Sequence, residues 1–435
     1  MSYMVRGVSF IYNVMRKLVF LLCLWICCYS LCVGKETGTT LFNAGEKGIN
    51  SYRIPSIVTT KDGSLLVFCE ARKVSWQDKS PTDIVMKRSQ DNGKTWSEIQ
   101  TLTQTQSGAF MDPTPVVDYI SGKIMLFTSY WPDDNHTGEK NIVFVITSTD
   151  NGKTWSKAKE VGNLFPIGRN KKIIGFGPGS GLQIKGEKFK NRMILPLRVL
   201  DVKEGQKYDV AAYSDNQGKT WKVGTAMAVD NELQIAESPL GVLVYNSRIP
   251  NGRMVGRSTD GGVTWRDSKK DPYLPGVSKG CQGSVLGNDS VLFYSGIKGT
   301  EASDEFDERA KLTLYKSIDS GLNWREHNLI HEKASGYSCM TFLTDGRIAI
   351  VYEAASTDGF TRKSIPGSRP LKRPEGWMKI DFNVITDIPA PAYSTYYYQR
   401  TSLFEQLPVY SDDIVFIGNS ITEEMNGLNN SIILM

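Results

Sequence analysis

The sequence predicts an all-β protein, and more specifically a six-bladed β-propeller. One eight-residue motif, Ser-x-Asp-x-Gly-x-Thr-Trp, occurs five times, and recurrence at such a period is the mark of a repeat architecture. Short β-branched and aromatic runs alternate with turn sequences, and no stretch keeps a 3.6-residue period over three turns. The motif starts 59, 66, 44 and 59 residues apart, at Ser89, Ser148, Ser214, Ser258 and Ser317.

The motif, here called the Asp-turn motif, has the chemistry of a tight β-turn. We expect its Asp to accept hydrogen bonds from backbone N–H groups two residues on and its Gly to take a positive φ. We expect its Trp to begin the next strand. The third copy has Asn216 at the Asp position, and the fifth has Asn323 at the Thr position. These motifs are predicted to hold the blades together without contacting a substrate.

Pairs of apolar runs around turn sequences predict successive hairpins. The clearest pairs are Ile54–Val58 with Leu65–Glu70, Pro115–Val117 with Ile124–Tyr130, and Phe342–Leu343 with Ile348–Glu353. Thr40–Asn43 and Met378–Ile385 are expected to be two further strands that close the ring, whereas Arg362–Trp377 is basic and rich in Pro and Gly, as surface loops are. The repeated region spans about 350 residues, and about 55–60 residues per blade would give six blades.

The N-terminus has the pattern of a signal peptide, expected over residues 1–34. Arg16 and Lys17 precede the apolar run Leu18–Val33, which is short for a membrane span. The protein is therefore expected to be exported (periplasmic, cell-surface or secreted), with no membrane span in the mature chain. Cys28 and Cys32 leave a lipoprotein anchor open as an alternative.

The composition is that of an ordinary globular protein, with 40% hydrophobic and 22% charged residues. The net charge is +5, and the expected leader carries three basic residues, so the mature chain is close to neutral and offers no electrostatic case for nucleic acid. The three histidines have no metal-ligand spacing and no Gly-rich phosphate loop occurs, so neither a metal nor an organic cofactor is expected. Cys69, Cys281 and Cys339 are expected to be buried free thiols.

Tyr52-Arg53-Ile54-Pro55, followed by the Asp-turn motifs, resembles the exo-α-sialidases (neuraminidases) of the bacterial and animal type. The resemblance covers about residues 36–388, and residues 35–390 are expected to form the sialidase propeller. It implies hydrolysis of terminal α-linked sialic acids on glycoproteins, glycolipids or oligosaccharides. It also implies a Tyr nucleophile, overall retention and no cofactor. A non-catalytic sialoglycan-binding propeller and a trans-sialidase, including an intramolecular one, remain alternatives.

A sialic acid carries a carboxylate on its anomeric carbon, so its binding site needs rigid cations. Arg suits this role because its planar fork binds a carboxylate through two hydrogen bonds. The resemblance implies three such arginines, which match Arg53, Arg248 in Tyr245-Asn246-Ser247-Arg248, and Arg309, eight residues before the fifth motif.

The same carboxylate explains why the family uses a tyrosine as its nucleophile. A carboxylate nucleophile would meet like-charge repulsion at that carbon, and sialidases are an exception to the two-carboxylate scheme of glycosidases. The matching residue is Tyr337 in Ser335-Gly336-Tyr337-Ser338. A phenol needs an adjacent base, which the resemblance assigns to Glu232, the first Glu of Glu-Leu-Gln-Ile-Ala-Glu. Glu237, the last residue of that sequence, is the alternative.

The acid/base residue implied by the resemblance is Asp78, which lies on a loop where it can reach the leaving oxygen. Asp83 is the alternative carboxylate nearby, with a structural role at the start of a strand as its simpler interpretation. Glu353 in Val351-Tyr352-Glu353 is expected to orient Arg53 without contacting the substrate.

The remaining pocket residues are also implied by the resemblance. Arg72 and Asp112 match positions that line the pocket toward a ring hydroxyl and the amide. Trp131 or Phe176 could pack against the N-acetyl methyl group, although aromatic residues of strands more often pack between blades. Gly177–Gly181 is expected to shape the edge of the pocket through its backbone.

The tail, residues 391–435, differs from the repeated region. Asp413-Ile-Val-Phe-Ile-Gly-Asn-Ser420-Ile-Thr resembles the opening block of the SGNH/GDSL-type esterases, in which a serine is the nucleophile. The Asp and His that such an enzyme needs lie near its far end, and the sequence ends 15 residues after Ser420. The tail is therefore expected to be a truncated and inactive esterase-like start.

Overall fold

The structure is a computed structural model that describes residues 38–78, 80–132, 138–227, 231–288, 290–299, 309–355 and 379–386. The expected signal peptide, the loop Arg362–Trp377 and the esterase-like tail lie outside the described residues. Apart from Gly38 and Thr39, everything described belongs to one compact unit, which begins at residue 40.

Strands and four short 3-10 helices make up the regular structure of the described residues, so the all-β prediction is confirmed. The 3-10 helices are η1 (Glu46–Gly48), η2 (Gly162–Leu164), η3 (Glu187–Phe189) and η4 (Pro239–Gly241). The first sheet contains β2 (Ser51–Thr59), β3 (Leu65–Arg72), β4 (Thr82–Ser89), β5 (Gln100–Thr101), β6 (Ala109–Val117), β7 (Ile124–Trp131), β8 (Ile142–Ser148) and β9 (Lys159–Glu160).

Three further sheets follow along the chain. One contains β10 (Lys171–Phe176), β11 (Leu182–Gln183), β12 (Met193–Asp201), β13 (Gln206–Ser214) and β14 (Lys222–Ala226). The next contains β15 (Leu233–Glu237), β16 (Leu243–Ile249), β17 (Gly252–Ser258) and β18 (Arg266–Lys270). The last contains β19 (Ser284–Gly287), β20 (Leu292–Ile297), β21 (Ala310–Ser317), β22 (Arg325–Phe342), β23 (Ile348–Ala354), β24 (Lys379–Ile385) and β1 (Thr39–Phe42).

The sheets are largely antiparallel meanders in which most strands pair with the next strand along the chain, as the hairpin pattern predicts. In the second sheet, β10 and β11 both pair with β12. All three predicted hairpins are present as β2–β3, β6–β7 and β22–β23. The two strands expected to close the ring, β1 and β24, lie next to each other in one sheet. A single parallel residue pair, Thr82 with Ala109, joins β4 to β6. The 18-residue strand β22 pairs with β21 through its first part and with β23 through its last part.

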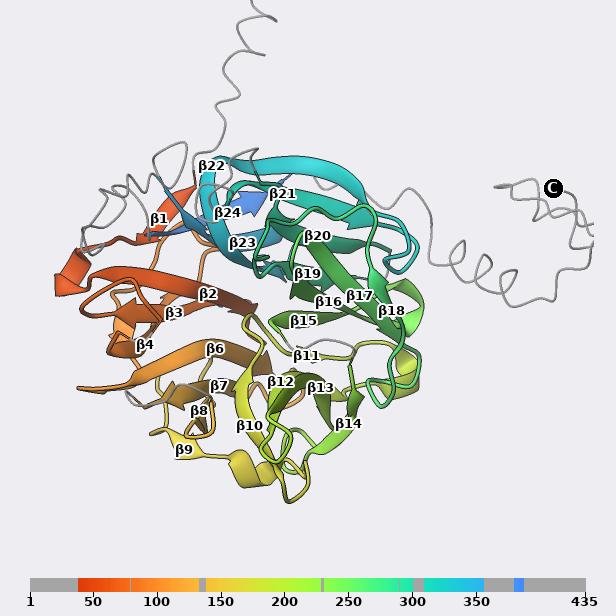
Figure 1. Cartoon of the computed structure of the whole chain (residues 1–435). Coiled ribbons are helices and arrows are strands. Elements are labelled where there is room, and N and C mark those ends of the chain that lie inside the picture. The colour runs from red at the N-terminus through yellow and green to blue at the C-terminus, as the bar shows by residue number, and fades with distance from the viewer. Residues whose placement is uncertain are drawn as a thin grey trace, which may run out of the picture. The chain divides into compact units, whose positions relative to one another are not determined.

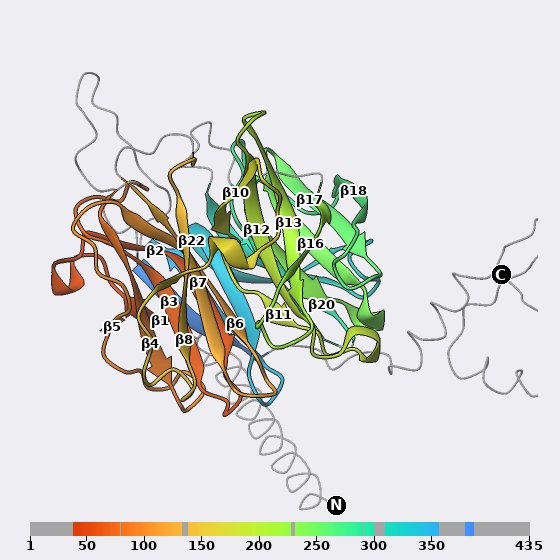
Figure 2. The ribbon, with the colours of Figure 1, turned by 90° about the horizontal axis from the view of Figure 1, so that it is seen from below.

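The meanders follow one another around a shared centre (Figures 1 and 2), and each contributes an innermost strand to that centre. β2 contacts β6, β6 contacts β10 and β11, β12 contacts β15, β15 contacts β19, and β19 contacts β22. Contacts between β22 and β2 complete the circuit. The chain therefore brings residues from its beginning and its end to the same central region.

The Asp-turn motifs are built alike, but the Asp reaches further along the chain than the sequence predicts. Asp91 Oδ1 accepts a hydrogen bond from the backbone N–H of Thr95, four residues on, at 2.9 Å, and Thr95 Oγ1 donates to Asp91 Oδ2 at 2.6 Å. The N–H two residues on, that of Gly93, donates to Ser89 Oγ instead, at 2.9 Å. The predicted positive φ of the glycine is confirmed, with Gly93 at 85°.

The tryptophans of the motifs close the core between neighbouring sheets. Three of them were expected to begin a strand but lie one residue before it: Trp221, Trp265 and Trp324. Trp221 is buried edge-on against Phe127 of β7, with ring centroids 5.9 Å apart. Because such aromatic pairs prefer edge-to-face geometry, they fix the distance between one sheet and the next. The three cysteines expected to be free, Cys69, Cys281 and Cys339, are unpaired and buried, which confirms that prediction.

Candidate active site

Three of the predicted site residues, Arg53, Asp112 and Tyr337, lie at β-bulges of innermost strands. The register shifts between Arg53 and Ser56 in β2, between Met111 and Thr114 in β6, and between Ser335 and Ser338 in β22. A bulge rotates the following side chain away from the regular alternation, and bulges are common next to active sites. The bulges thus aim Arg53, Asp112 and Tyr337 into the centre of the fold.

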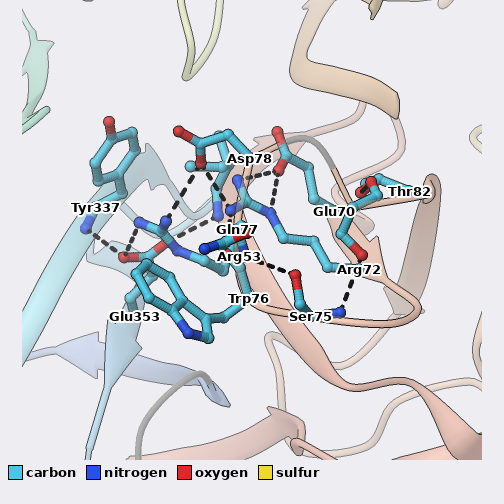
Figure 3. A network of polar contacts seen from close by, with 12 residues as sticks. Arg53, Glu70, Arg72, Ser75, Trp76, Gln77, Asp78, Thr82, Tyr337 and Glu353 are labelled. Carbon is cyan, nitrogen blue, oxygen red and sulfur yellow. Dashed lines mark hydrogen bonds and ion pairs between the residues drawn. The ribbon is translucent and has the colours of Figure 1, made fainter. Parts of the chain in front are cut away.

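Arg53 is held by a carboxylate from the far end of the described chain. Its Nε and one NH2 nitrogen donate to the two carboxylate oxygens of Glu353 at 3.0 and 3.2 Å, and the N–H of Ile54 donates to the same carboxylate at 3.0 Å. Both side chains are buried. Glu353 therefore fixes the guanidinium plane of Arg53, the geometry expected of a positioning residue (Figure 3).

The three predicted arginines converge on Tyr337. The guanidinium carbon of Arg53 lies 5.6 Å from the centroid of the Tyr337 ring, and that of Arg309 lies 5.9 Å from it. Arg248 NH1 donates to the Tyr337 hydroxyl at 2.9 Å. Arg248 is fixed by the carbonyl of Lys279, and Arg309 by the carbonyl of Gly280. Three cations from three parts of the chain thus surround one phenol.

Glu232 completes this group, because the Tyr337 hydroxyl donates a hydrogen bond to Glu232 Oε1. Arg248 NH1 lies 2.9 Å from the other carboxylate oxygen of Glu232. Burial raises the pKa of Glu232, but the charge of Arg248 and the hydrogen bond from Tyr337 outweigh it and bring that pKa below its usual value. Burial, together with the charge of Glu232, raises the pKa of Tyr337 well above its usual value. The phenol therefore keeps its proton next to an ionised base.

Gly336 makes the approach of Tyr337 to Glu353 sterically feasible. A Cβ at position 336 would lie 2.2 Å from Glu353 Oε2, well inside van der Waals contact. The N–H of Tyr337 donates to that same oxygen at 3.3 Å. Any side chain at Gly336 would therefore displace either the tyrosine or the carboxylate that holds Arg53.

The two alternative carboxylates have other partners. Glu237 accepts hydrogen bonds from the backbone N–H groups of Lys185 and Gly186, both at 2.8 Å. Asp83 pairs with Lys73 Nζ at 2.6 Å and accepts the N–H of Thr105 at 2.8 Å. Their contacts therefore fix loops, and neither accepts a hydrogen bond from Tyr337 among the contacts that the structure describes.

Asp78 lies at the mouth of the site, with 73% of its side chain exposed. Its carboxylate accepts a hydrogen bond from Arg72 NH1 at 2.8 Å and lies 3.7 Å from Arg53 NH1 (Figure 3). Desolvation raises the pKa of Asp78, but the charges of Arg72 and Arg53 outweigh it and hold that pKa below its usual value. The predicted acid/base is therefore an exposed carboxyl on a loop, and two arginines hold its pKa down.

Arg72 is completely buried, and its donors are occupied. Nε and NH2 donate to Glu70 Oε2 at 2.9 and 2.6 Å, and NH1 donates to the carbonyl of Trp76 at 2.5 Å as well as to Asp78. This arrangement holds the loop that carries Asp78. The expected contact between Arg72 and a ring hydroxyl stays a prediction.

Asp112 is buried beside Glu70, whose Oε1 accepts the N–H of Asp112 at 3.0 Å. Burial and the negative charge of Glu70 raise the pKa of Asp112 well above its usual value, although Arg198 opposes the shift. A carboxyl that holds its proton can donate a hydrogen bond to a sugar oxygen, which suits the expected contact with a ring hydroxyl or amide.

The two aromatic candidates for the N-acetyl group differ in position. Phe176 is fully buried in the core with Phe127 and Phe165, so its environment is that of blade packing. Trp131 is half-buried, and its indole N–H donates to Ser129 Oγ at 3.1 Å. In Gly177–Gly181, a Cβ at Gly179 would lie 1.3 Å from Gln234 Nε2. The absence of a side chain at Gly179 thus lets the segment pack directly against Gln234.

Sequence reasoning missed two charged residues at the site, Glu70 and Arg198. Glu70 holds Arg72, and Arg198 contributes to the electrostatics of Asp112 and Glu232. Both lie within otherwise apolar strands, Leu-Leu-Val-Phe-Cys-Glu-Ala-Arg and Met-Ile-Leu-Pro-Leu-Arg-Val-Leu-Asp. A charge inside such a run must be paired when buried, so this pattern could have identified them.

Within the described ranges, no group of three or more His, Cys, Asp or Glu side chains is placed to hold a metal ion. The same part of the chain contains no helix with the length and apolar character that crossing a membrane requires.

The repeated sheets and Asp-turn motifs correspond to a known family, since residues 63–350 match the model of the BNR repeat-like domain. The chain belongs to the BNR repeat-like domain family. Curated relatives of this BNR repeat protein include a sialidase of Micromonospora viridifaciens, 29% identical over 338 residues. A sialidase of Bacteroides fragilis is 28% identical over 364 residues. These alignments cover 71% and 73% of the chain but only 50% and 62% of the relatives' own lengths.

Solved structures show the fold. The Hadza microbial sialidase Hz136 superposes with a TM-score of 0.65 at 24% identity, covering 74% of this chain and 67% of that one. A leech intramolecular trans-sialidase complexed with 2,7-anhydro-Neu5Ac superposes with a TM-score of 0.62 at 18% identity, covering 80% and 70%. The BNR repeat protein therefore has the β-propeller fold of the sialidases.

Proposed function

We propose that this BNR repeat protein is an exo-α-sialidase, which releases terminal α-linked sialic acids from glycoproteins, glycolipids or oligosaccharides. One observation carries the proposal: the Tyr337 hydroxyl contacts both Glu232 and Arg248, while Arg53 and Arg309 lie against the same ring. Few reactions need a phenol that is hydrogen-bonded to a carboxylate base and has three arginines next to it. Displacement at a carbon that carries a carboxylate is one of them. The sialidase relatives support the same conclusion.

Binding in this proposal begins with the sialic acid carboxylate between Arg53, Arg248 and Arg309. Charge-assisted hydrogen bonds contribute about 1.5–3 kcal/mol each, so the three arginines dominate the affinity for the ground state. Because Glu353 already orients Arg53, little side-chain freedom is lost when the carboxylate enters.

The proposed reaction proceeds by two displacements. Tyr337 attacks the anomeric carbon as Glu232 takes its proton, and Asp78 gives a proton to the departing glycosidic oxygen. In the second step Asp78 takes a proton from water, whose oxygen displaces Tyr337 from the anomeric carbon, and Glu232 returns the proton to the phenol. Two inversions give overall retention.

The test is fluorogenic release of sialic acid from a methylumbelliferyl α-sialoside by the full chain and by Tyr337→Phe. Parent activity that falls by more than about 1,000-fold in the variant supports both the reaction and the nucleophile. A parent that binds sialic acid without turnover would replace the enzyme with a non-catalytic sialoglycan-binding propeller. Equal activity in both proteins would exclude Tyr337 as the nucleophile.

The same residues would serve a trans-sialidase, which passes the sialyl group to an acceptor other than water. Mass analysis of the products from sialyllactose separates the outcomes. Hydrolysis yields free sialic acid, intermolecular transfer yields a new sialoside with an added acceptor, and intramolecular release yields the anhydro sugar, lighter by one water. We propose hydrolysis as the main outcome.

We further propose that the propeller has six blades. β22 is long enough to serve two blades, and β4 and β6 are joined by only one residue pair. Dividing the sheets at these places gives six groups of consecutive strands: β2–β5, β6–β9, β10–β14, β15–β18, β19–β21 with the first part of β22, and the rest of β22 with β23, β24 and β1.

Export through residues 1–34 also belongs to this proposal and rests on the sequence alone. Expression of the full gene with N-terminal sequencing of the mature protein tests the leader.

A further inference from the structure

Arg198 lies in the central part of β12, at the candidate active site. In the sheet register it lies between Gly175 of β10 and Asp209 of β13. The charges that act on it most strongly are those of Asp209, Asp112 and Glu232, followed by Tyr337. The guanidinium therefore interacts electrostatically with these carboxyls and with Tyr337, although Arg198 does not belong to the three predicted arginines.

Within the described part of the chain, the Nε donors of Arg198 and Arg309 lack the acceptors that those of the other site arginines have. Arg53, Arg72 and Arg248 each hydrogen-bond a carboxylate, those of Glu353, Glu70 and Glu232. Arg198 Nε is buried, and among the described residues no atom accepts a hydrogen bond from it. A buried donor without an acceptor is costly and calls for a partner such as a bound ligand.

Polar side chains from neighbouring strands meet around Gly175, beside Arg198. A Cβ at Gly175 would lie 3.7 Å from Asp112 Oδ2, 3.8 Å from Ser129 Oγ and 3.9 Å from Arg198 Cδ. Side chains from β6, β7 and β12 thus meet at one point. The indole N–H of Trp131 donates to Ser129 Oγ, so Trp131 adjoins this group of polar side chains.

We propose that Arg198 determines specificity by donating hydrogen bonds to an uncharged oxygen on the C5–C9 side of the bound sugar. This rests on the proposed sialidase function. The three arginines account for the carboxylate of a sialic acid, and Asp112 is expected to contact a ring hydroxyl. Two kinds of hydrogen-bond acceptor on the sugar then have no assigned donor. These are the carbonyl of the N-acyl group at C5 and the hydroxyls of the glycerol chain. Arg198 adjoins Asp112 at Gly175, so we assign one of these acceptors to it.

The experiment compares three methylumbelliferyl glycosides in the full chain. The first carries N-acetylneuraminic acid, the second has a hydroxyl in place of the N-acetyl group, and the third has its glycerol chain shortened to C7. The variants are Arg198→Met and Arg198→Lys. The control is Arg192→Met. Arg192 lies just before the same strand, β12, and forms an ion pair with Asp215 at 2.6 Å.

For Arg198→Met we expect kcat/KM on the N-acetylneuraminic glycoside to fall by about 10–100-fold, mainly through KM, since one charged hydrogen bond is lost. The loss should nearly vanish on the one analogue that lacks the contacted group, which distinguishes the acyl carbonyl from the glycerol hydroxyls. Arg192→Met should behave like the parent on all three glycosides.

An equal loss on all three glycosides, with a shifted pH profile, would overturn the proposal and assign Arg198 to the electrostatics of Glu232 and Asp112. If Arg198→Met does not fold, as judged by its melting temperature, Arg198→Lys keeps the charge, and its loss must show the same selectivity. If the parent cleaves none of the glycosides, the sialidase function fails separately. Calorimetric binding of 2,3-didehydro-2-deoxy-N-acetylneuraminic acid and its C7 and C5-hydroxyl analogues then tests Arg198 by the same comparison.

Discussion

The two ends of the innermost strands differ sharply in chemistry. Arg53 lies near the beginning of β2, and Tyr337 lies near the beginning of the part of β22 that pairs with β23, within the group of arginines and carboxyls. Toward the other ends of the same strands, residues such as Thr59 and Thr341 line a cavity of about 410 Å³. Its one carboxylate is that of Glu237, whose oxygens are occupied by backbone N–H groups.

An uncharged polar layer separates the two ends. Gln282 exchanges hydrogen bonds with the backbone of Ser338, each at 3.0 Å, and Ser284 Oγ donates to Gln234 Oε1 at 2.9 Å. Both glutamines are buried. The fold can thus satisfy its central polar groups without charges. The buried charges around Tyr337 therefore mark that end as the candidate functional site.

The largest effect should come from comparing Glu232 and Glu237, which lie at opposite ends of β15. Glu232→Gln removes the base beside Tyr337, so we expect kcat to fall by about 100–10,000-fold. Glu237→Gln weakens two hydrogen bonds at the cavity end, so activity should stay within about two-fold while stability falls by about 1 kcal/mol. Steady-state kinetics and urea unfolding of both variants measure this. Comparable losses of activity in the two variants would break the distinction between the ends.

Asp78→Asn should give the next largest effect, and one that depends on the leaving group. We expect a fall of about 100-fold on sialyllactose, whose leaving oxygen needs a proton, and less than about 10-fold on the methylumbelliferyl sialoside. The pKa of Asp78 is below its usual value. The carboxyl therefore loses its proton at acidic pH, and only a small protonated fraction is left near neutral pH. In the parent, kcat/KM on sialyllactose should therefore fall toward neutral pH, and Asp78→Asn should lose this dependence. An unchanged pH profile would contradict the assignment.

A smaller effect is expected from Glu353→Gln, with Asp345→Asn as its control at the other end of the β22–β23 hairpin. Glu353 is buried against Arg53, so its loss should raise KM by about 10-fold and lower stability by about 3 kcal/mol. Asp345 forms an exposed ion pair with Arg347 at 2.7 Å, and its loss should cost less than about 1 kcal/mol. Equal changes in KM would show that Glu353 does not position Arg53.

The smallest effect concerns an Asp-turn motif far from the chemistry. Hydrogen bonds from Thr95 lower the pKa of Asp91 to about 2. The unfolded value is about 3.9, so the stabilisation is present above pH 4 and is lost as pH falls toward 2. Asn216, in the third motif, makes the corresponding bonds to Thr220 without a charge.

Asp91→Asn should therefore keep full activity and lower the melting temperature at pH 7 by at most about 2 °C. The difference from the parent should shrink as pH is lowered from 4 to 2, since the parent then loses its charge. Calorimetric melting curves across this range measure it. A difference that grows at low pH would contradict the pKa of Asp91.

Local chemistry determined much of this protein from its sequence. The hairpins, the five Asp-turn motifs and the pairing partners β1 and β24 follow from short-range patterns of apolar, turn and β-branched residues. The arginines and the candidate nucleophile follow from motifs that a resemblance could match. Even here the sequence alone was imprecise, since the Asp of each motif, or Asn216 in the third copy, accepts a hydrogen bond from the N–H four residues on. This detail is set by the backbone path of the turn.

Only the tertiary structure decided which charges meet. Arg53 and Glu353 are 300 residues apart, and Glu232 and Tyr337 are 105 apart. Glu232 and Glu237 lie in one motif, yet they lie at opposite ends of β15 with different partners. Glu70 and Arg198, hidden within apolar strands, join the site only through the packing of neighbouring sheets. The physical reason is that a β-strand's side chains acquire partners from other strands, and the closure of the ring selects those partners.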